Sequence, residues 1–423
     1  MNIIPYINKE TSWSFQNLNT NKTQYLTHGY HRYPAKFIPQ LVFRLIKEYS
    51  KPGDRICDPF GGCGTTLVEA KLAKRPSIGF DINPLAILIT KAKTTPISPI
   101  ILTKRFSELT DRIGNEPLGS SRGLKTHINH DRLLYWFNNS NLERLLSLKS
   151  NIEKEKVPAI RRFFLCAFSH ILKNCSYWLS KSTKPQKNPN KVPDSPLKVF
   201  KKHVSYMMSR NEDFFKELKK YGSHDIPAIM KKADARSLPL PNDCLDLIIT
   251  SPPYSTSYEY PDIHQLSALL FGFCSSVNEF RRNFIGSRGN FHNRDEILTN
   301  PLVIEAIKDL KKEDASLAKA ISNYFVDMNK VYNEIHRVLR KGKRACIVIG
   351  DTELRGISIP NMKVAIDQMR EAGFKLEKII KRPISGRVLT PFRNRNNGRF
   401  TSPKDPTAKK VYSHEYIIVM RKK

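Results

Sequence analysis

A short apolar run that stops at two consecutive prolines constrains the fold of this 423-residue chain more than any other feature. The run covers residues 245–250 and predicts a buried strand. The tetrapeptide Ser251-Pro252-Pro253-Tyr254 follows it directly. Neither proline has an N–H to donate to a neighbouring strand, so the chain must leave the sheet here with fixed φ angles. A rigid loop at the carboxyl end of a parallel strand is where open α/β sheets bind their ligands.

The side chains of this loop suit a ligand that carries an exocyclic amine. The hydroxyl oxygen of Ser251 and the carbonyl of Pro252 can accept hydrogen bonds from an NH2 group, and the Tyr254 ring can stack on the attached heterocycle. In isolation, however, a Pro-Pro pair after a strand more often marks a simple chain break. Other parts of the sequence have to decide between these interpretations.

A second predicted strand, residues 54–58, ends in an acid and leads into a glycine-rich turn. The strand, turn and following residues read Asp58, Pro59, Phe60, Gly61, Gly62, Cys63, Gly64, Thr65 and Thr66, and a predicted helix starts at residue 67. The glycines allow a ligand to approach the backbone, and the threonines can cap the helix. The turn lacks the lysine of a phosphate loop, and its acid precedes the glycines. An acid there would repel a pyrophosphate but attract a ligand with an ammonium group, such as S-adenosylmethionine.

Two further acids follow the same pattern. Asp81 ends the next predicted strand and lies about twenty residues after Asp58, near the spacing at which a carboxylate meets ribose hydroxyls in nucleotide-binding folds. Asp234 precedes the strand at 245–250 and could reach an adenine amino group. Each acid alone is explained by helix capping or solvation. Their number and order together favour a binding site.

These motifs resemble those of the S-adenosylmethionine-dependent amino-group DNA methyltransferases. Residues 58–66 look like the family's cofactor loop, Asp81 like its ribose-binding acid, and residues 251–254 like its catalytic motif. The serine form is similar to the branch that methylates cytosine at N4, whereas the adenine-N6 branch more often has Asp or Asn there. A segment before the first strand resembles the part that covers the methionine end of the cofactor, and it contains Tyr33, Pro34 and Lys36.

The resemblance implies a fold, a cofactor and a partner. The expected fold is α/β, a Rossmann-like methyltransferase sheet with helices on both faces. The expected cofactor is S-adenosyl-L-methionine, and the expected partner is double-stranded DNA. A cognate restriction endonuclease would accompany the enzyme without a stable complex. A target base inside a duplex must be flipped out to reach the loop, and we expect it to stack on Tyr254, with Tyr258 and Tyr260 as nearby alternatives.

The family motifs divide the chain into four parts. Residues 1–24 are predicted to form a polar N-terminal arm, and residues 25–95 the cofactor-binding half of the methyltransferase domain. Residues 96–230 form an insert that the family motifs do not explain. Its apolar periodicity predicts a largely helical unit, and we expect it to recognise DNA. Residues 231–423 are predicted to form the catalytic half, with basic loops at 280–300 and 381–410.

Charge supports a nucleic-acid partner. The chain has 71 Lys and Arg against 39 Asp and Glu, a formal net charge of +32. Basic residues gather near the insert's proline-containing loop and in the two loops of the catalytic half. The candidate DNA-binding residues are Lys198, Lys201, Lys202, Arg281, Arg282, Arg288, Arg393 and Arg395.

Two other classes of function remain open at this point. One is an RNA exocyclic-amine methyltransferase, which the absence of a recognisable RNA-binding module disfavours. The other is a non-catalytic nucleic-acid-binding protein on a decayed methyltransferase fold, which the intact motifs disfavour. The seven cysteines show no metal-binding spacing, so no metal site is predicted. No signal peptide or membrane-spanning run is predicted, and we expect a cytoplasmic, nucleoid-associated protein.

Overall fold

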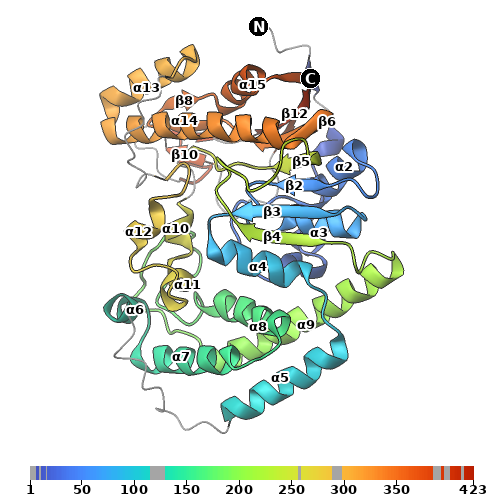
Figure 1. Cartoon of the computed structure of the whole chain (residues 1–423). Coiled ribbons are helices and arrows are strands. Elements are labelled where there is room, and N and C mark those ends of the chain that lie inside the picture. The colour runs from blue at the N-terminus through green and yellow to red at the C-terminus, as the bar shows by residue number, and fades with distance from the viewer. Residues whose placement is uncertain are drawn as a thin grey trace.

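The computed structural model describes residues 6–8, 11–15, 17–114, 129–255, 259–287, 298–383, 392–394, 401–410 and 414–423. An eight-stranded sheet runs through its centre in the order β1-β9-β12-β6-β5-β2-β3-β4 (Figure 1). The strands are β1 (Ile7–Asn8), β2 (Ile56–Asp58), β3 (Ser77–Asp81), β4 (Ala228–Lys232), β5 (Leu245–Thr250), β6 (Leu339–Ile349), β9 (Phe374–Pro383) and β12 (His414–Lys422). Strand β12 is antiparallel to both its neighbours, and the other adjacent pairs are parallel.

Helices cover both faces of this sheet. Side chains alternate between the faces along each strand, so Leu247 and Ile248 of β5 belong to different hydrophobic cores. The core that contains Ile248 packs against α13 (Pro301–Glu313), α14 (Ala315–Val338) and α15 (Asn361–Glu371). The core that contains Leu247 packs against α2 (Pro39–Tyr49) and α3 (Thr65–Leu72). This arrangement confirms the predicted Rossmann-like α/β class.

The insert is a helical unit that lies beyond the β4 edge of the sheet (Figure 1). It contains α5 (Pro99–Gly114), α6 (His130–Trp136), α7 (Asn139–Glu153), α8 (Pro158–Ile171) and α9 (Pro196–Lys220). Its apolar side chains, among them Leu145, Phe163 and Met207, share a third core with α4 (Pro84–Thr94) and α11 (Gln265–Leu270). The apolar stripe predicted for this region therefore packs inward. Strand β4 crosses the boundary predicted at residue 230 and belongs to the central sheet.

The N-terminal segment, predicted as a polar arm, is partly built into the domain. Strand β1 pairs in parallel with β9 at the edge of the sheet. Trp13, in the short helix η2 (Thr11–Trp13), is fully buried beside α2, and the Arg44 guanidinium lies 3.8 Å from the centre of its ring. A buried tryptophan and a paired strand tie this segment to the fold.

The remaining short elements connect these layers. They are α1 (Thr20–Thr23), η3 (Leu26–Gly29), α10 (Tyr260–Ile263), α12 (Val277–Arg281), the hairpin of β7 (Thr352–Leu354) with β8 (Ile357–Ile359), and the hairpin of β10 (Phe392–Asn394) with β11 (Ala408–Lys410). In the described parts of the chain, no helix has the length and apolar character to cross a membrane.

Candidate active site

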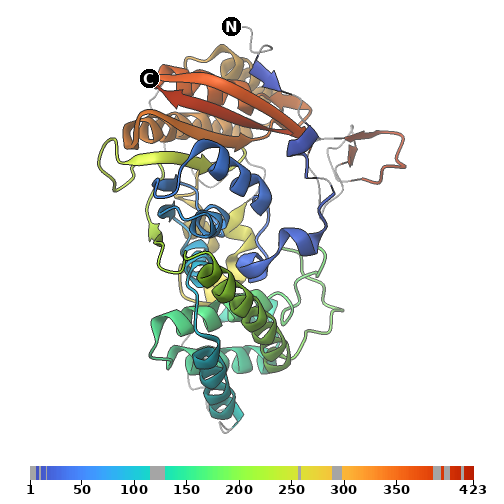
Figure 2. The ribbon, with the colours of Figure 1, turned by 90° about the vertical axis from the view of Figure 1, so that its right-hand side faces the viewer.

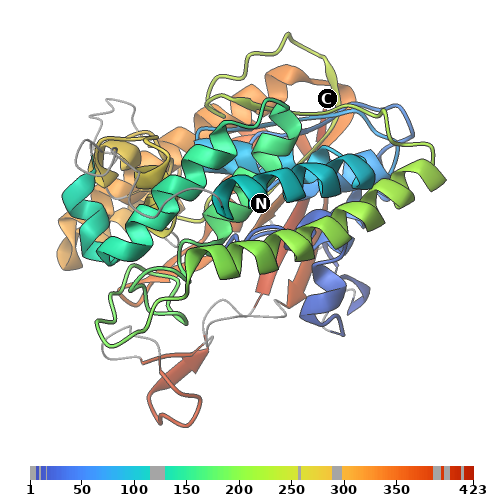
Figure 3. The same cartoon turned by 90° about the horizontal axis from the view of Figure 1, so that it is seen from below.

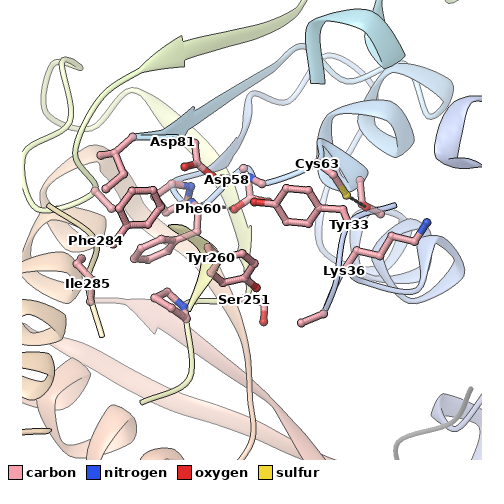
Figure 4. Close-up of a pocket in the computed structure, with 18 of the residues that line it drawn as sticks. Tyr33, Lys36, Asp58, Phe60, Cys63, Asp81, Ser251, Tyr260, Phe284 and Ile285 are labelled. Carbon is pink, nitrogen blue, oxygen red and sulfur yellow. Dashed lines mark hydrogen bonds between the residues drawn. The ribbon is translucent and has the colours of Figure 1, made fainter. Parts of the chain in front are cut away.

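Four polar residues from different strands meet in one pocket at the carboxyl edge of the sheet (Figure 4). Asp58 and Asp81 are the last residues of β2 and β3, Ser251 directly follows β5, and Asp234 follows β4. The four strands are parallel, so their carboxyl ends lie at the same edge. The topology thus brings together residues that are almost 200 positions apart in the chain.

Asp58 is buried and held by three hydrogen bonds. Its carboxylate accepts one from the Phe60 N–H at 3.1 Å, one from the Thr250 hydroxyl at 2.6 Å and one from the Thr66 hydroxyl at 2.8 Å. Burial raises the pKa of Asp58 to about 6, and these three donors oppose the rise. The carboxylate is therefore fixed in place at the floor of the pocket, where a cationic ligand would favour its charged form.

The glycine-rich turn approaches the pocket closely. Gly62 and Gly64 have φ angles of 49° and 79°, in the left-handed region that favours glycine. A Cβ added to Gly64 would come within 2.6 Å of the Thr90 side chain, so no larger residue fits there. The expectation that the threonines cap the helix is wrong, because Gly64 occupies the cap position of α3 and Thr66 bonds to Asp58 instead.

Asp81 is anchored by backbone donors. Its two carboxylate oxygens accept hydrogen bonds from the Gly62 N–H at 3.0 Å and from the Asn83 N–H at 2.8 Å. The pKa of Asp81 is raised to about 6. Burial is the main cause, the nearby charge of Asp58 adds to the rise, and the backbone hydrogen bonds oppose it. Each oxygen keeps acceptor capacity, which suits a pair of vicinal hydroxyls.

Apolar side chains line one end of the pocket beside the acids. Phe60 lies next to Phe284 and Ile285 (Figure 4), and these form a slot that fits a flat ring. Asp234 also lines the pocket, and the Arg236 guanidinium bonds to its carboxylate at 2.5 Å. Sequence reasoning missed Phe284 and Ile285. The signal for them was an apolar pair inside a loop that otherwise looks polar.

The opposite end of the pocket is aromatic and basic. Tyr33 and Lys36 come from the segment before α2, and in Figure 4 the phenol of Tyr33 points toward Asp58 and Asp81. The Lys36 ammonium donates to the His28 carbonyl at 3.1 Å, and burial followed by the charge of Lys93 lowers the pKa of Lys36 to about 8. Pro34, predicted with them, is half-buried and does not line the pocket.

The tetrapeptide predicted to be catalytic, residues 251–254, only partly lines the pocket. Ser251 and Pro253 line the pocket, whereas Pro252 is buried and Tyr254 is not among the lining residues. The Tyr254 hydroxyl donates to the Glu415 carboxylate at 3.3 Å, and its ring lies 3.2 Å from where a Cβ on Gly350 would be. The aromatic ring that does line the pocket near Ser251 is Tyr260, stacked on Tyr33 at 5.8 Å between ring centres.

The predicted DNA-binding residues differ in their surroundings. Lys198, Lys201 and Lys202 are exposed on the first turns of α9, and Arg282 is exposed after α12. Arg281 instead forms an ion pair with Asp262, which suits it less to a phosphate contact. The side chain of Arg393 is not described, and Arg288, Arg395 and Tyr258 lie outside the described residues.

Two basic segments extend from the same side of the molecule. Figures 2 and 3 show that the loop before α9 and the β10–β11 hairpin both project there. Within the loop, the Lys187 ammonium lies 4.4 Å from the centre of the Tyr135 ring, and Lys191 donates to the carbonyls of Lys173 and Trp178. Lys181 and Lys184 in the same loop are exposed. The loop is therefore held by some of its lysines and presents others to solvent.

The chain matches a known protein family over most of its length. A family model described as DNA methylase, of the N6/N4 methyltransferase type, matches residues 6–92 and 245–423, more than half of the chain. The segment between the two matched regions contains the helical insert.

Individual relatives extend across the insert. The chain is 29% identical over 371 residues to the type II methyltransferase M.MvaI of Kocuria varians, a match that covers 81% of this chain and 80% of that protein. It is 26% identical to the type II methyltransferase M.AvaI of Anabaena variabilis, covering 88% and 83%. A solved TehB-like S-adenosylmethionine-dependent methyltransferase from Corynebacterium glutamicum has 10% identity, covering 90% of this chain and 87% of that one, with a TM-score of 0.30.

The family match identifies an S-adenosylmethionine-dependent DNA methyltransferase. The chain belongs to the DNA methylase family whose members modify amino nitrogens at N6 or N4.

Proposed function

We propose that the chain transfers a methyl group from S-adenosylmethionine to the N4 amine of a cytosine in double-stranded DNA, as the modification enzyme of a type II restriction–modification system. The observation that carries the base assignment is Ser251, whose side chain enters the pocket beside the two acids. The type II methyltransferases among the relatives support the setting.

The pocket offers a matching group for each part of the cofactor. Asp81 would accept the ribose hydroxyls, and the apolar slot of Phe60, Phe284 and Ile285 would hold the adenine ring with Asp234 at its edge. Asp58 would favour the positively charged methionine end, whose carboxylate would face Lys36. Bound there, S-adenosylmethionine supplies an electrophilic methyl group on its sulfonium.

The catalytic loop would prepare the target amine by accepting its hydrogens. An amine conjugated into its ring is a poor nucleophile. The Ser251 oxygen and the Pro252 carbonyl would accept hydrogen bonds from the two amine N–H groups. These bonds would draw the nitrogen toward tetrahedral geometry and free its lone pair. The freed lone pair would face the pocket, where bound S-adenosylmethionine would supply the methyl group and leave as S-adenosylhomocysteine, and the amine proton would pass to water. No covalent intermediate with the protein is required.

The target base would enter the pocket after it is flipped out of the duplex. Tyr260, stacked on Tyr33 at the pocket wall, is placed to receive its ring, whereas Tyr254 faces Glu415. We therefore assign the stacking role to Tyr260 in place of Tyr254. The neighbouring bases would be read by the insert and the β10–β11 hairpin, because a loop that holds one flipped base contacts no other.

The modified base itself tests this proposal. DNA from cells that express the protein is digested to nucleosides and analysed by mass spectrometry, beside DNA from cells that express the Ser251→Ala variant. We expect N4-methylcytosine in the first sample alone. A digest with N6-methyladenine as the new base would overturn the cytosine assignment, and a digest without any new methylated base would overturn the enzymatic one.

A further inference from the structure

An asparagine and a histidine connect the acid side of the pocket with its aromatic side. Asn83 caps α4 just after Asp81, and its backbone N–H donates to the Asp81 carboxylate at 2.8 Å. Its side-chain nitrogen Nδ2 lies 2.9 Å from Nδ1 of His264, which stands between α10 and α11. Asn83 is 1% exposed and His264 is 4% exposed. The fold therefore builds a buried pair from two segments that lie 181 positions apart in the chain.

The helix cap fixes the direction of this hydrogen bond. Oδ1 of Asn83 accepts from the Leu85 N–H at 3.0 Å, so the amide presents its NH2 group to His264. Nδ1 of His264 therefore accepts, and the ring is neutral with its hydrogen on Nε2. Burial lowers the pKa of His264 to about 4, so the ring keeps this form at neutral pH. Nε2 has no hydrogen-bond partner among the described residues, so Asn83 supplies the polar contact that orients the ring.

The oriented ring packs against two rings that line the pocket. Its centre lies 4.9 Å from that of Tyr33 and 6.0 Å from that of Tyr260. The two tyrosines are themselves stacked, and we call them the aromatic wall. Both line the pocket, whereas His264 does not. His264 thus supports the wall that would receive the target base, and through Asn83 it is tied to Asp81.

We propose that Asn83 and His264 are positioning residues that hold the aromatic wall at a fixed place relative to Asp81, so that a flipped base stacks with its amine toward the cofactor's methyl group. This inference rests on the proposed function, in which the wall receives that base. It gives a role in the reaction to two residues that do not line the pocket. Asn83 holds the acid by its backbone and the wall by its side chain, so one amino acid sets the spacing of the two subsites.

The test measures methyl transfer to long, unmethylated duplex DNA of mixed sequence, at saturating cofactor and DNA. Asn83→Ser keeps a hydroxyl that can cap α4 and keeps the backbone N–H on Asp81, but it removes the amide that orients His264. We expect kcat to fall about tenfold, because the base is then held off its reactive position, with the DNA KM and the cofactor Kd unchanged. His264→Phe keeps a ring without the acceptor and should show the same loss, as should the double variant.

The variant Tyr260→Ala decides whether the pair acts through the aromatic wall. In that background Asn83→Ser should lower kcat by less than about twofold further, because the ring that it positions is gone. Losses that multiply would overturn the proposal, since independent structural damage at two sites predicts multiplication.

Asn300 offers a matched control. The same sequence, Asn-Pro-Leu, starts α4 and α13, and at α13 the Asn300 side chain accepts from the Leu302 N–H at 3.0 Å and donates to Asp367 at 3.2 Å. Asn300→Ser removes an equivalent amide and should lower thermal stability without changing kcat.

The remaining outcomes are also decisive. An equal fall of kcat in Asn300→Ser, or a wild-type kcat in Asn83→Ser, would reject the proposal. If His264→Phe does not fold, Asn83→Ser decides through the comparisons with Tyr260→Ala and Asn300→Ser. A wild-type protein that transfers no methyl group to DNA would instead reject the proposed function.

Discussion

The acids Asp58 and Asp81 and the loop that follows β5 line the same pocket but are held in place in different ways. Asp81 is fixed by backbone donors of Gly62 and Asn83, both within twenty residues of it. Tyr254 is fixed by Glu415, 161 residues further along the chain. One part of the site is therefore encoded largely by short motifs, and the other depends on the completed sheet. Changes to the first should alter cofactor binding, and changes to the second should alter the chemical step.

The largest expected effect separates chemistry from binding. Ser251→Ala removes the oxygen that accepts a hydrogen of the amine, and we expect kcat to fall by about 10²–10³, as for the loss of one oriented catalytic hydrogen bond. The cofactor Kd, measured by calorimetry, should not change. Ser255→Ala is the matched control, because that buried serine bonds to Thr352 at 2.8 Å and serves the loop's structure. A cofactor Kd that rises in Ser251→Ala would contradict the division between cofactor binding and the chemical step.

A tenfold effect is expected from the cofactor side. Asp58→Ala should weaken S-adenosylmethionine binding at least tenfold, about 1.4 kcal/mol, because the cationic end of the cofactor then has no charged partner at this position. Asp246 offers a control, since it is also a buried acid with donors, from the Arg55 N–H at 3.0 Å and from Arg340 at 2.7 Å, but it lies at the opposite end of β5. Equal cofactor affinity in the wild type and in Asp58→Ala would show that this acid is structural alone.

Acid pH should also weaken cofactor binding, as Asp58→Ala does. The pKa of Asp58 and that of Asp81 are both raised to about 6, so each carboxylate is charged at pH 7 and mostly protonated at pH 5. The cationic end of the cofactor and its ribose hydroxyls both bind better to a charged carboxylate. The affinity for the cofactor is therefore full above pH 6 and falls as the pH drops through 6. We expect binding about tenfold weaker at pH 5 than at pH 7 for one such group. Calorimetry across this range gives the profile, and a flat profile would contradict it.

The smallest expected effect concerns the insert. Changing Lys198, Lys201 and Lys202 to Gln should weaken DNA binding at all sequences and reduce the slope of log K against log salt by up to about 0.9 for each phosphate that the protein no longer neutralises. The same change at Lys216, Lys219 and Lys220 removes equal charge from the far end of α9, away from the loop and hairpin (Figure 3). Equal slopes in the two triple variants would show that the DNA-binding face does not include the start of α9.

Much of the fold followed from local patterns in the sequence. The strands that end in Asp58 and Asp81 and the strand before Ser251 predicted an open α/β sheet, and the structure confirms it. Their meeting in one pocket follows because the carboxyl ends of parallel strands share an edge. The roles of these residues in binding and catalysis stay predictions.

Other features depend on long-range contacts that no local sequence pattern predicts. Strand β1 has only two residues, and its pairing with β9 joins opposite ends of the chain. Arg236 lies two positions after Asp234 and bonds to it, and Asp327 in α14 holds the other side of the guanidinium, a contact that the sequence does not predict. Glu415 looks in the sequence like an ordinary charge in an edge strand. Its hydrogen bond with Tyr254 appears only when β12 lies between β9 and β6.

The position of β12 has a consequence for how the protein matures. Its sequence is the last of the sheet to leave the ribosome, yet it occupies an interior place between β6 and β9. Until it inserts, two strand edges stay open, and such edges favour misassociation. The nascent chain would also lack Glu415, and with it the support of the catalytic loop. We therefore expect a chain without β12 to have an open sheet and no methyltransferase activity.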